Sequence, residues 1–415
     1  MKYIDYRQSE LYVEDVRLTD IAVQFDTPSY VYSRACIENN WHSFDSAFQD
    51  IPHKICYAVK ANSNIGILNV LARLGSGFDI VSMGELERVL AANGDPKKIV
   101  FSGVGKRDDE LKRALAVGIY CFNIESDIEI ERLNSLAKQH KQVANVALRV
   151  NPNIDSGTHP YISTGLKENK FGIDIESAHS LCQTIKQFSN LQLIGIACHI
   201  GSQLTSLEPF LAAIDKVVDL INLLKNENIQ LEHINIGGGL GIRYSTESPP
   251  SIINYVNALC DSLRSLSLQV IIEPGRAIVA NAGVLLTKVE YVKHTPHKKF
   301  AIVDAGMNDL LRPALYNAWQ DIIPVILDNN LDKCMYDIVG PVCESADFIG
   351  KNRFLCLKQN DLLAVCSSGA YGFSMSSTYN SRPRVAEILV DKNQSHLIRP
   401  RETITDLFIS ERMLP

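Results

Sequence analysis

Between Lys54 and Glu273 two patterns of apolar residues alternate regularly along the sequence, and this alternation limits the possible fold more than any other feature. Short apolar runs, typical of strands buried on both faces, are followed by stretches with apolar residues every three or four positions, typical of helices. About eight strands separated by about seven helices imply a parallel sheet and favour a closed (β/α)8 barrel of the TIM type. An open doubly wound sheet is the alternative. The expected strands are residues 54–61, 77–82, 99–103, 121–125, 146–151, 193–200, 234–237 and 269–273.

After Glu273 the chain consists of β-branched and aromatic runs separated by proline and glycine turns, without long helices between them. This pattern predicts a second, mostly antiparallel β domain, built as a sandwich or a barrel. We expect the short strands near the N-terminus to join it. The expected domains are residues 1–30, an N-terminal strand piece of the β domain; residues 31–275, the barrel; and residues 276–415, the C-terminal β domain.

The composition excludes few classes of function. The chain has 415 residues and a net charge of −6, which argues against nucleic acid or an anionic membrane as a partner. No apolar run approaches the roughly 18 residues of a membrane span. Residues 1–18 lack the apolar core of a signal peptide, so we expect a cytoplasmic protein. The ten cysteines form no C-x-x-C pair and the histidines show no metal-binding spacing, so we expect no metal site.

Polar residues stand at the expected C-terminal ends of the barrel strands, where the reactive groups of such barrels lie. They are Lys60, Asp79, Ser82, Ser102, Glu125, Arg149, Asn151, His199, Gly237, Gly238, Gly239 and Glu273. A barrel that needed only stability would not require so many charges at these positions. The set as a whole, rather than any single member, therefore predicts an active site at this end of the barrel.

Lys60 ends the apolar run that begins at Ile55. Burial disfavours the ammonium form of a lysine and lowers its pKa, which suits an amine that attacks a carbonyl group. The alternative is a surface lysine at the end of a strand, and the hexapeptide around Lys60 does not decide between the two.

The glycine-rich sequence Gly237-Gly238-Gly239-Leu240-Gly241 directly follows an expected strand. Glycines allow backbone N–H groups to approach an anion closely, and the loops after the last two strands commonly bind phosphate in this fold. The sequence matches neither G-x-G-x-x-G nor a P-loop. A tight turn without a ligand is the alternative.

Glu273 and His199 end two further strands. A buried carboxylate requires a positive partner, and Glu273 could keep the ring nitrogen of a pyridine protonated; a structural ion pair with Arg276 is the alternative. His199 could stack on a planar cofactor, with Ser202 binding a phosphate, or it could be an ordinary core histidine. A reactive lysine, an anion-binding turn and a carboxylate on one rim together match the requirements of pyridoxal 5′-phosphate.

At this point the chain resembles the alanine-racemase-fold group of pyridoxal-phosphate decarboxylases, and within it the diaminopimelate decarboxylase family. The motifs that carry the resemblance are Tyr57-Ala58-Val59-Lys60-Ala61-Asn62, His199-Ile200-Gly201-Ser202-Gln203, Gly237-Gly238-Gly239-Leu240-Gly241, Glu273-Pro274-Gly275-Arg276, Cys343-Glu344-Ser345-Ala346-Asp347 and Gly369-Ala370-Tyr371-Gly372. The first four are shared with ornithine and arginine decarboxylases. Two others look specific to the diaminopimelate branch: His159 to Gly165 with Lys170-Phe171-Gly172, and Tyr379-Asn380-Ser381-Arg382-Pro383-Arg384.

The resemblance implies a set of site residues. As cofactor contacts it implies Lys60, Asp79, Arg149, His199, Ser202, Gly237, Gly238, Gly239, Glu273, Gly275, Arg276 and Tyr371. As substrate contacts it implies Arg276, Arg312, Tyr316, Glu344 and Tyr371. Lys60, His199 and Cys343 are implied as catalytic, with Cys343 as a proton donor; without the motif, Cys343 would be read as one buried cysteine among ten. The resemblance also implies a homodimer in which the β domain of one chain completes the barrel site of the other.

The implied reaction is decarboxylation of meso-2,6-diaminopimelate to L-lysine and CO2, the last step of lysine biosynthesis. A decarboxylase acting on ornithine or arginine, a non-catalytic pyridoxal-phosphate carrier, and an aldolase that uses Lys60 without a cofactor are the competing hypotheses. Residues 152–172 interrupt the alternation and carry Tyr161, Lys167 and Lys170. We interpret this segment as a lid over the barrel mouth, or alternatively as a surface excursion.

Overall fold

The computed structural model describes residues 3–49, 51–154, 169–328 and 332–415. Within these ranges the chain forms two compact units. The barrel unit contains Asn40–Ile242 and Ser248–Ala277, and the β unit contains Met1–Asn39, Arg243–Glu247 and Ile278–Pro415. The domain boundaries expected from the sequence, after residues 30 and 275, stay predictions. Most of the expected lid, including Tyr161 and Lys167, lies outside the described residues.

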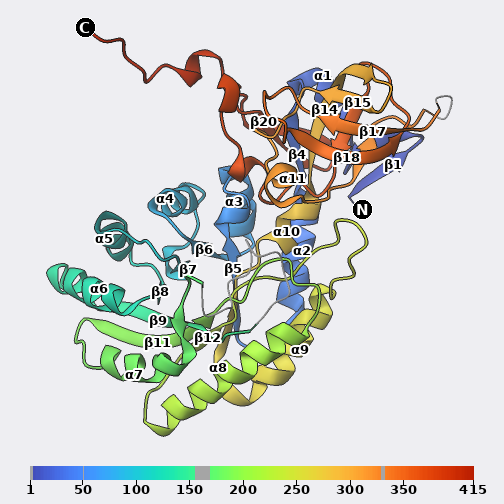
Figure 1. Ribbon diagram of the computed structural model, residues 1–415. Coiled ribbons are helices and arrows are strands. Elements are labelled where there is room, and N and C mark those ends of the chain that lie inside the picture. The colour runs from blue at the N-terminus through green and yellow to red at the C-terminus, as the bar shows by residue number, and fades with distance from the viewer. Residues whose placement is uncertain (1–2, 50, 155–168, 329–331) are drawn as a thin grey trace. The chain divides into compact units, whose positions relative to one another are not determined.

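The barrel unit is a closed parallel barrel, which confirms the expected fold class (Figure 1). Its strands are β5 (His53–Ala58), β6 (Gly77–Ile80), β7 (Ile99–Phe101), β8 (Cys121–Ile124), β9 (Ala144–Asn151), β11 (Leu191–Cys198), β12 (His233–Asn235) and β13 (Gln269–Ile272). Successive strands pair in parallel, and β13 pairs with β5 to close the ring. A short strand, β10 (Ile173–Asp174), pairs with the end of β9.

Helices connect the strands and lie on the outside of the barrel (Figure 1). They are α3 (Ile65–Arg73), α4 (Met83–Ala91), α5 (Asp108–Val117), α6 (Asp127–Gln139), α7 (Ile175–Ile185), α8 (Glu208–Asn226) and α9 (Ile252–Leu263). Ser82, Ser126 and Ser251 begin α4, α6 and α9 by accepting hydrogen bonds from backbone N–H groups three residues later. Gly118 ends α5 with a φ of 66°, a left-handed conformation that glycine adopts without strain.

A buried cluster of mostly small and branched side chains packs among the barrel strands. Its members are Cys56, Val100, Cys121, Ala147, Ile194, Ala197 and Ile271. This apolar layer fills the barrel as a core rather than a channel. The candidate site therefore lies beyond this layer, among the polar groups near the C-terminal ends of the strands.

The β unit is organised around one large sheet in the order β18-β17-β15-β14-β4-β20-β21. These strands are β4 (Ser29–Ser33), β14 (Gly283–His294), β15 (Lys299–Val303), β17 (Cys334–Val339), β18 (Phe348–Leu355), β20 (Ala386–Asp391) and β21 (Gln394–Arg399); β16 (Ile322–Pro324) and β19 (Leu362–Val365) pair beside β14. A separate small sheet contains β1 (Ile4–Arg7), β2 (Glu10–Val13) and β3 (Val16–Arg17). The short helix α11 spans Arg312–Tyr316.

The N-terminal strand β4 lies inside the large sheet, between β14 and β20. Its pairing with β20 and the pairing of β15 with β17 are parallel, while the other pairs of this sheet are antiparallel. The sequence reading missed the helix α1 (Leu18–Phe25), which buries Leu18 and Ile21 in the core of this unit. Two helices, α2 (Arg34–Ala47) and α10 (Arg276–Val279), carry the chain from one unit to the other.

Candidate active site

Lys60 lies in the short helical turn Val59–Ala61 directly after β5. Its Nζ is 2.6 Å from Oδ2 of Asp79, which is fully buried on the neighbouring strand β6. The Lys60 side chain is 39 % exposed, so it is not buried at the strand tip. The amine is accessible at the barrel mouth, and a buried carboxylate holds it in place.

Glu273 follows β13 and is 8 % exposed. Its Oε1 accepts hydrogen bonds from Nδ2 of Asn235 at 2.7 Å and from Nδ2 of Asn123 at 3.4 Å. Burial, together with the negative charge of Asp79, raises the pKa of Glu273 to about 7, against the opposing effect of the positive charge of Lys60. The carboxyl group is therefore in an environment that disfavours its charged form unless a positive partner is supplied.

The three consecutive glycines after β12 are required by close backbone contacts. A Cβ on Gly238 would stand 2.3 Å from the backbone oxygen of Glu273, and one on Gly239 would stand 2.5 Å from that of Gly201. The N–H of Gly237 donates to Oδ1 of Asn235 and the N–H of Gly238 to Nδ1 of His199. Two of the three amides thus hold the turn itself, which makes the N–H of Gly239 the candidate donor to an anion.

His199 follows β11, and its Nδ1 accepts the Gly238 N–H at 3.2 Å. Burial, together with the positive charges of Arg149 and Lys60, lowers the pKa of His199 well below its usual range. A neutral ring that accepts at Nδ1 carries its proton at Nε2. This arrangement fixes both the tautomer and the orientation of the imidazole.

The loops after β11 and β13 are also joined to each other and to the lysine turn. Arg276 is 7 % exposed, and its Nη2 donates to Oγ of Ser202 at 3.0 Å. A Cβ on Gly275 would lie 3.0 Å from Cβ of Ala61, so this glycine allows the loop after β13 to pack against the turn that carries Lys60.

Arg149, near the end of β9, forms a buried ion pair with Glu125: Nη1 and Oε1 are 2.7 Å apart. The same Glu125 carboxylate accepts the N–H of Gly103 at 2.6 Å and, through its other oxygen, the N–H of Gly172 at 3.2 Å. Glu125 therefore orients Arg149 and also fixes the segment that follows residue 168. Removing one partner of such a buried ion pair strongly destabilises a protein, because the other charge is left buried without a partner.

No role is predicted from the sequence for Asn123 or Asn235, and Glu125 is predicted only as one of the polar strand ends. The signal for Asn235 was available, because it is a polar residue inside an apolar strand and two positions before the glycines. For Asn123 the partner Glu273 is 150 residues away along the chain, and no local pattern indicates such a contact.

The remaining candidates belong to the β unit. Cys343 is exposed, whereas seven of the ten cysteines are buried, and its N–H donates to Oδ1 of Asn380 at 2.8 Å. Oε1 of Glu344 accepts the hydroxyl of Tyr379 at 2.6 Å. The structure thus brings together two separate motifs, the one around Cys343 and the one around Asn380.

Arg312 begins α11 and is 7 % exposed, with its guanidinium carbon 4.5 Å from the ring centre of Tyr244. Tyr316 ends the same helix. Tyr371 adopts a φ of 55° in the tight turn after Gly369, a left-handed conformation that is uncommon for a tyrosine. These residues belong to a different unit from Lys60, and each is described here only within its own unit.

The barrel residues fit pyridoxal phosphate. Lys60 offers an accessible amine, and a protonated ring nitrogen would supply the positive partner that Glu273 lacks. Oδ1 of Asp79 and Oδ1 of Asn123 are buried and have no hydrogen-bond partner among the described residues, so the site has unused acceptors near Glu273 and Lys60.

Two kinds of feature are absent from the part of the chain that the structure describes. No group of three histidine, cysteine, aspartate or glutamate side chains there could hold a metal ion. Within the same residues, no helix has both the length and the apolar character needed to cross a membrane.

Comparison with known proteins places these residues in a family context. Residues 34–280 match the family model for the pyridoxal-binding domain of pyridoxal-dependent decarboxylases. The chain is 58 % identical over 417 residues to the diaminopimelate decarboxylase of Vibrio cholerae and 55 % identical over 415 residues to that of Pseudomonas aeruginosa, each match covering 100 % of both chains. The crystal structure of diaminopimelate decarboxylase from Helicobacter pylori complexed with L-lysine superimposes with a TM-score of 0.92 at 42 % identity, covering 95 % of this chain and 99 % of that one.

Proposed function

Because this chain belongs to the diaminopimelate decarboxylase family of pyridoxal-dependent decarboxylases, we propose that it converts meso-2,6-diaminopimelate to L-lysine and CO2 with pyridoxal phosphate as cofactor. The observation that carries this proposal is the identity of 58 % over the whole length, which covers both units. A carrier that only bound the cofactor would need the barrel alone. The enzyme is a carboxy-lyase, and its product is lysine.

In the proposed mechanism, Nζ of Lys60 would hold the cofactor covalently, at the position that the substrate amine would take. Bound there, pyridoxal phosphate supplies an electron-withdrawing ring that stabilises the negative charge left at Cα when the carboxylate departs. Glu273 would keep a proton on the ring nitrogen, and Asn235 and Asn123 fix the orientation of its carboxylate by donating hydrogen bonds to Oε1. Neutral His199, fixed by Gly238, presents a flat apolar face without adding a competing positive charge.

The other cofactor contacts are proposed on the same basis. Gly239, with Ser202 and Tyr371, would bind the phosphate, and Arg276 orients the Ser202 hydroxyl. Asp79 positions the Lys60 amine through their 2.6 Å ion pair. Arg149 contributes positive charge, held in place by Glu125.

We propose that Arg276 of the barrel unit and several residues of the β unit select the substrate and complete the reaction. Arg276 and Arg312 suit its carboxylates, because a guanidinium pairs with a carboxylate through two parallel hydrogen bonds. Glu344 suits the ammonium group at the far end, with Tyr316 and Tyr371 beside the substrate. Cys343 donates the proton of its Sγ to Cα after CO2 has left; its exposure on the β unit makes that thiol available.

A panel of substrates tests the proposed function. We expect CO2 release from meso-diaminopimelate to exceed that from ornithine and arginine by at least about 10⁴-fold in kcat/KM, because a site built to bind a second carboxylate rejects analogues that lack it. Release can be measured from carboxyl-labelled substrates at equal enzyme concentration. Turnover of ornithine or arginine alone would show that the chain is a different basic-amino-acid decarboxylase.

We also propose that the protein is a homodimer in which each active site combines the barrel of one chain with Cys343 and Glu344 of the other. The exposure of Cys343 and Glu344 supports this, since both are available to a partner chain. Mixing the inactive variants Lys60→Arg and Cys343→Ala after reversible dissociation should restore about a quarter of the wild-type rate. Half of randomly mixed dimers are hybrids, and each hybrid has one intact site. If each site were formed by one chain, the mixture would remain inactive.

A cytoplasmic location is proposed as well. The structure leaves all ten cysteines as free thiols, which is typical of a reducing compartment. Fractionation of cells that produce the protein would test this, and recovery outside the cytoplasm would contradict it.

A further inference from the structure

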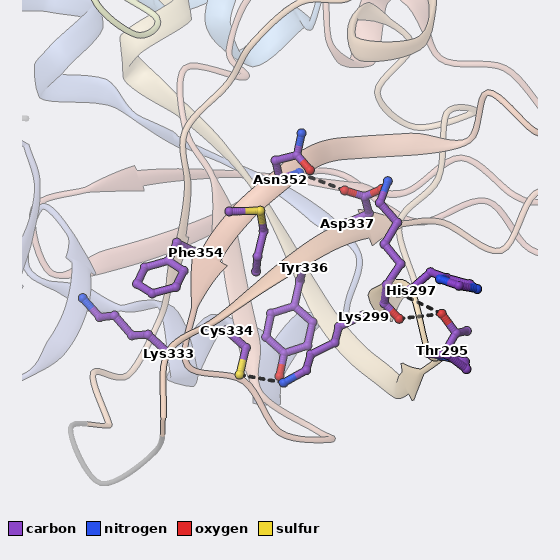
Figure 2. Close-up of a pocket in the computed structure, with 12 residues that line it drawn as sticks. Thr295, His297, Lys299, Lys333, Cys334, Tyr336, Asp337, Asn352 and Phe354 are labelled. Carbon is purple, nitrogen blue, oxygen red and sulfur yellow. Dashed lines mark hydrogen bonds and ion pairs between the residues drawn. The ribbon is translucent and has the colours of Figure 1, made fainter.

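The β unit contains a pocket of about 530 Å³ beside the first residues of β15 and β17, apart from every residue assigned to the reaction (Figure 2). Its lining includes Lys299, which begins β15, and Cys334, which begins β17. The two strands pair in parallel, with Lys299 opposite Tyr336. The backbone therefore holds the two side chains next to each other on one wall of the pocket.

The Nζ of Lys299 lies 2.8 Å from the Sγ of Cys334, and Figure 2 shows the Tyr336 side chain reaching the same point. The hydrogen bond to Cys334 is the main cause that raises the pKa of Lys299. Tyr336 is 4 % exposed, so it forms a fixed floor beneath this pair, while Cys334 itself is half-buried and faces the pocket. At this distance the amine can reach the sulfur with almost no movement once an oxidant has converted the thiol to a sulfenic acid.

Accessibility separates Cys334 from most other cysteines in the chain. Seven cysteines are buried, and the three that solvent reaches are Cys334, Cys343 and Cys356. Oxidants act on cysteines according to exposure and thiolate character, so these three are the ones that a peroxide can attack. Of these three, Cys334 has a lysine amine 2.8 Å from its Sγ.

We propose that Cys334 and Lys299 form a peroxide-sensitive modification site, in which the oxidised thiol is captured by the amine as a covalent N–S bond. Hydrogen peroxide first converts the thiol to a sulfenic acid and releases one water molecule. The lone pair of the Lys299 nitrogen then forms the N–S bond as the S–O bond breaks. The departing hydroxyl group leaves as water with one proton from the nitrogen, and the sulfur is reduced back to its original state when a thiol later cleaves the bond.

The proposed bond would tie the first residue of β15 to the first residue of β17. It would also protect Cys334 from sulfinic and sulfonic acids, the irreversible products of further oxidation. This inference does not depend on the decarboxylase activity and is tested without it.

Peptide mapping of the full-length, cofactor-loaded protein tests the proposal after treatment with hydrogen peroxide at mildly alkaline pH, where more of the lysine is uncharged. We expect a linked pair of peptides containing Cys334 and Lys299, about 2 Da lighter than their sum, that dithiothreitol separates. The Lys299→Gln variant should lack the linked pair and accumulate sulfinic acid at Cys334 several-fold faster. Lys333→Gln is the matched control, because Lys333 lines the same pocket but its side chain extends away from Cys334 (Figure 2).

The Cys356→Ser variant removes one ambiguity, since a disulfide between Cys334 and Cys356 would also lighten the peptides by about 2 Da. We expect the linked pair to persist in this variant. A disulfide to Cys356, a linked pair about 14 Da heavier than the sum because an oxygen bridges the two atoms, or equal oxidation of Cys334 with and without Lys299 would each overturn the proposal. The first two of these outcomes are read from the wild-type map, so the proposal can be overturned even if a variant fails to fold.

Discussion

Replacement of Lys60 by arginine is expected to reduce decarboxylation by at least about 10³-fold, in line with the loss of a group that takes direct part in the chemistry. Arginine keeps the positive charge that pairs with Asp79, so the buried carboxylate retains its partner and the fold should be preserved. A guanidinium cannot form the bond to the cofactor aldehyde that an amine forms. The barrel should therefore remain intact while its chemistry is lost.

Three measurements check this prediction: CO2 release, the absorbance of bound cofactor near the visible edge, and the thermal melting temperature. The matched control is Lys112→Arg, on the exposed face of α5, which should leave all three unchanged. A Lys60→Arg variant that retained a tenth of the wild-type rate would show that Lys60 is not the residue that holds the cofactor.

The second large effect is expected at Glu273. Replacement by glutamine should lower kcat by about 10²-fold or more, because a neutral amide cannot stabilise a protonated ring nitrogen as a carboxylate does. The same change should stabilise the cofactor-free protein at pH 8. Glu273 would then be required for the reaction and would also lower the stability of the cofactor-free fold, as is common for buried charges with a function.

The sign of the stability effect follows from the raised pKa of Glu273. The carboxyl group takes up its proton near pH 7 in the folded chain, against an ordinary value of 4.5. Between these values the folded chain binds a proton that the unfolded chain does not, so stability falls as pH rises from 4.5 to 7 and then levels off. A shift of this size corresponds to a loss of about 3 kcal/mol at pH 8, which glutamine would remove.

Chemical denaturation of the cofactor-free proteins at pH 5 and pH 8 provides the measurement. The unfolding free energies of wild type and Glu273→Gln should be similar at pH 5 and should differ at pH 8, with the variant more stable. Glu131→Gln on the exposed side of α6 is the control, for which we expect no pH-dependent difference. A difference between wild type and Glu273→Gln that did not change with pH would contradict the shifted pKa.

Both experiments concern the rim of the barrel. The rim could be located from the sequence because each barrel strand appears as a short apolar run in the sequence itself. Apolar runs and helical periodicity extend over a few residues, so they can be read without knowing what any residue contacts. The closed barrel and the positions of Lys60 and Glu273 at strand ends could be predicted in this way. The helix α1 could not, because its stability comes from packing Leu18 and Ile21 against the β unit rather than from its own sequence.

The contacts of each group at the rim could not be predicted from the sequence. The sequence indicated a buried Lys60 and placed Asp79 on the same rim, whereas only the fold shows that Lys60 is partly exposed and pairs with Asp79. It also suggested an anion-binding run of three glycines, whereas the fold uses the amides of Gly237 and Gly238 to hold the turn.

The sequence by itself determined the family, the barrel and the identity of the groups that can carry out the chemistry, since these depend on local pattern and on residue type. Only the tertiary structure decided which side chains hold these reactive groups in position. Asn235 and Asn123 reach Glu273 from 38 and 150 residues away, and Lys299 meets Cys334 across two paired strands. Such contacts arise when distant segments become neighbours on the closed barrel or on one sheet, and this is a property of the whole fold that no short window of sequence contains.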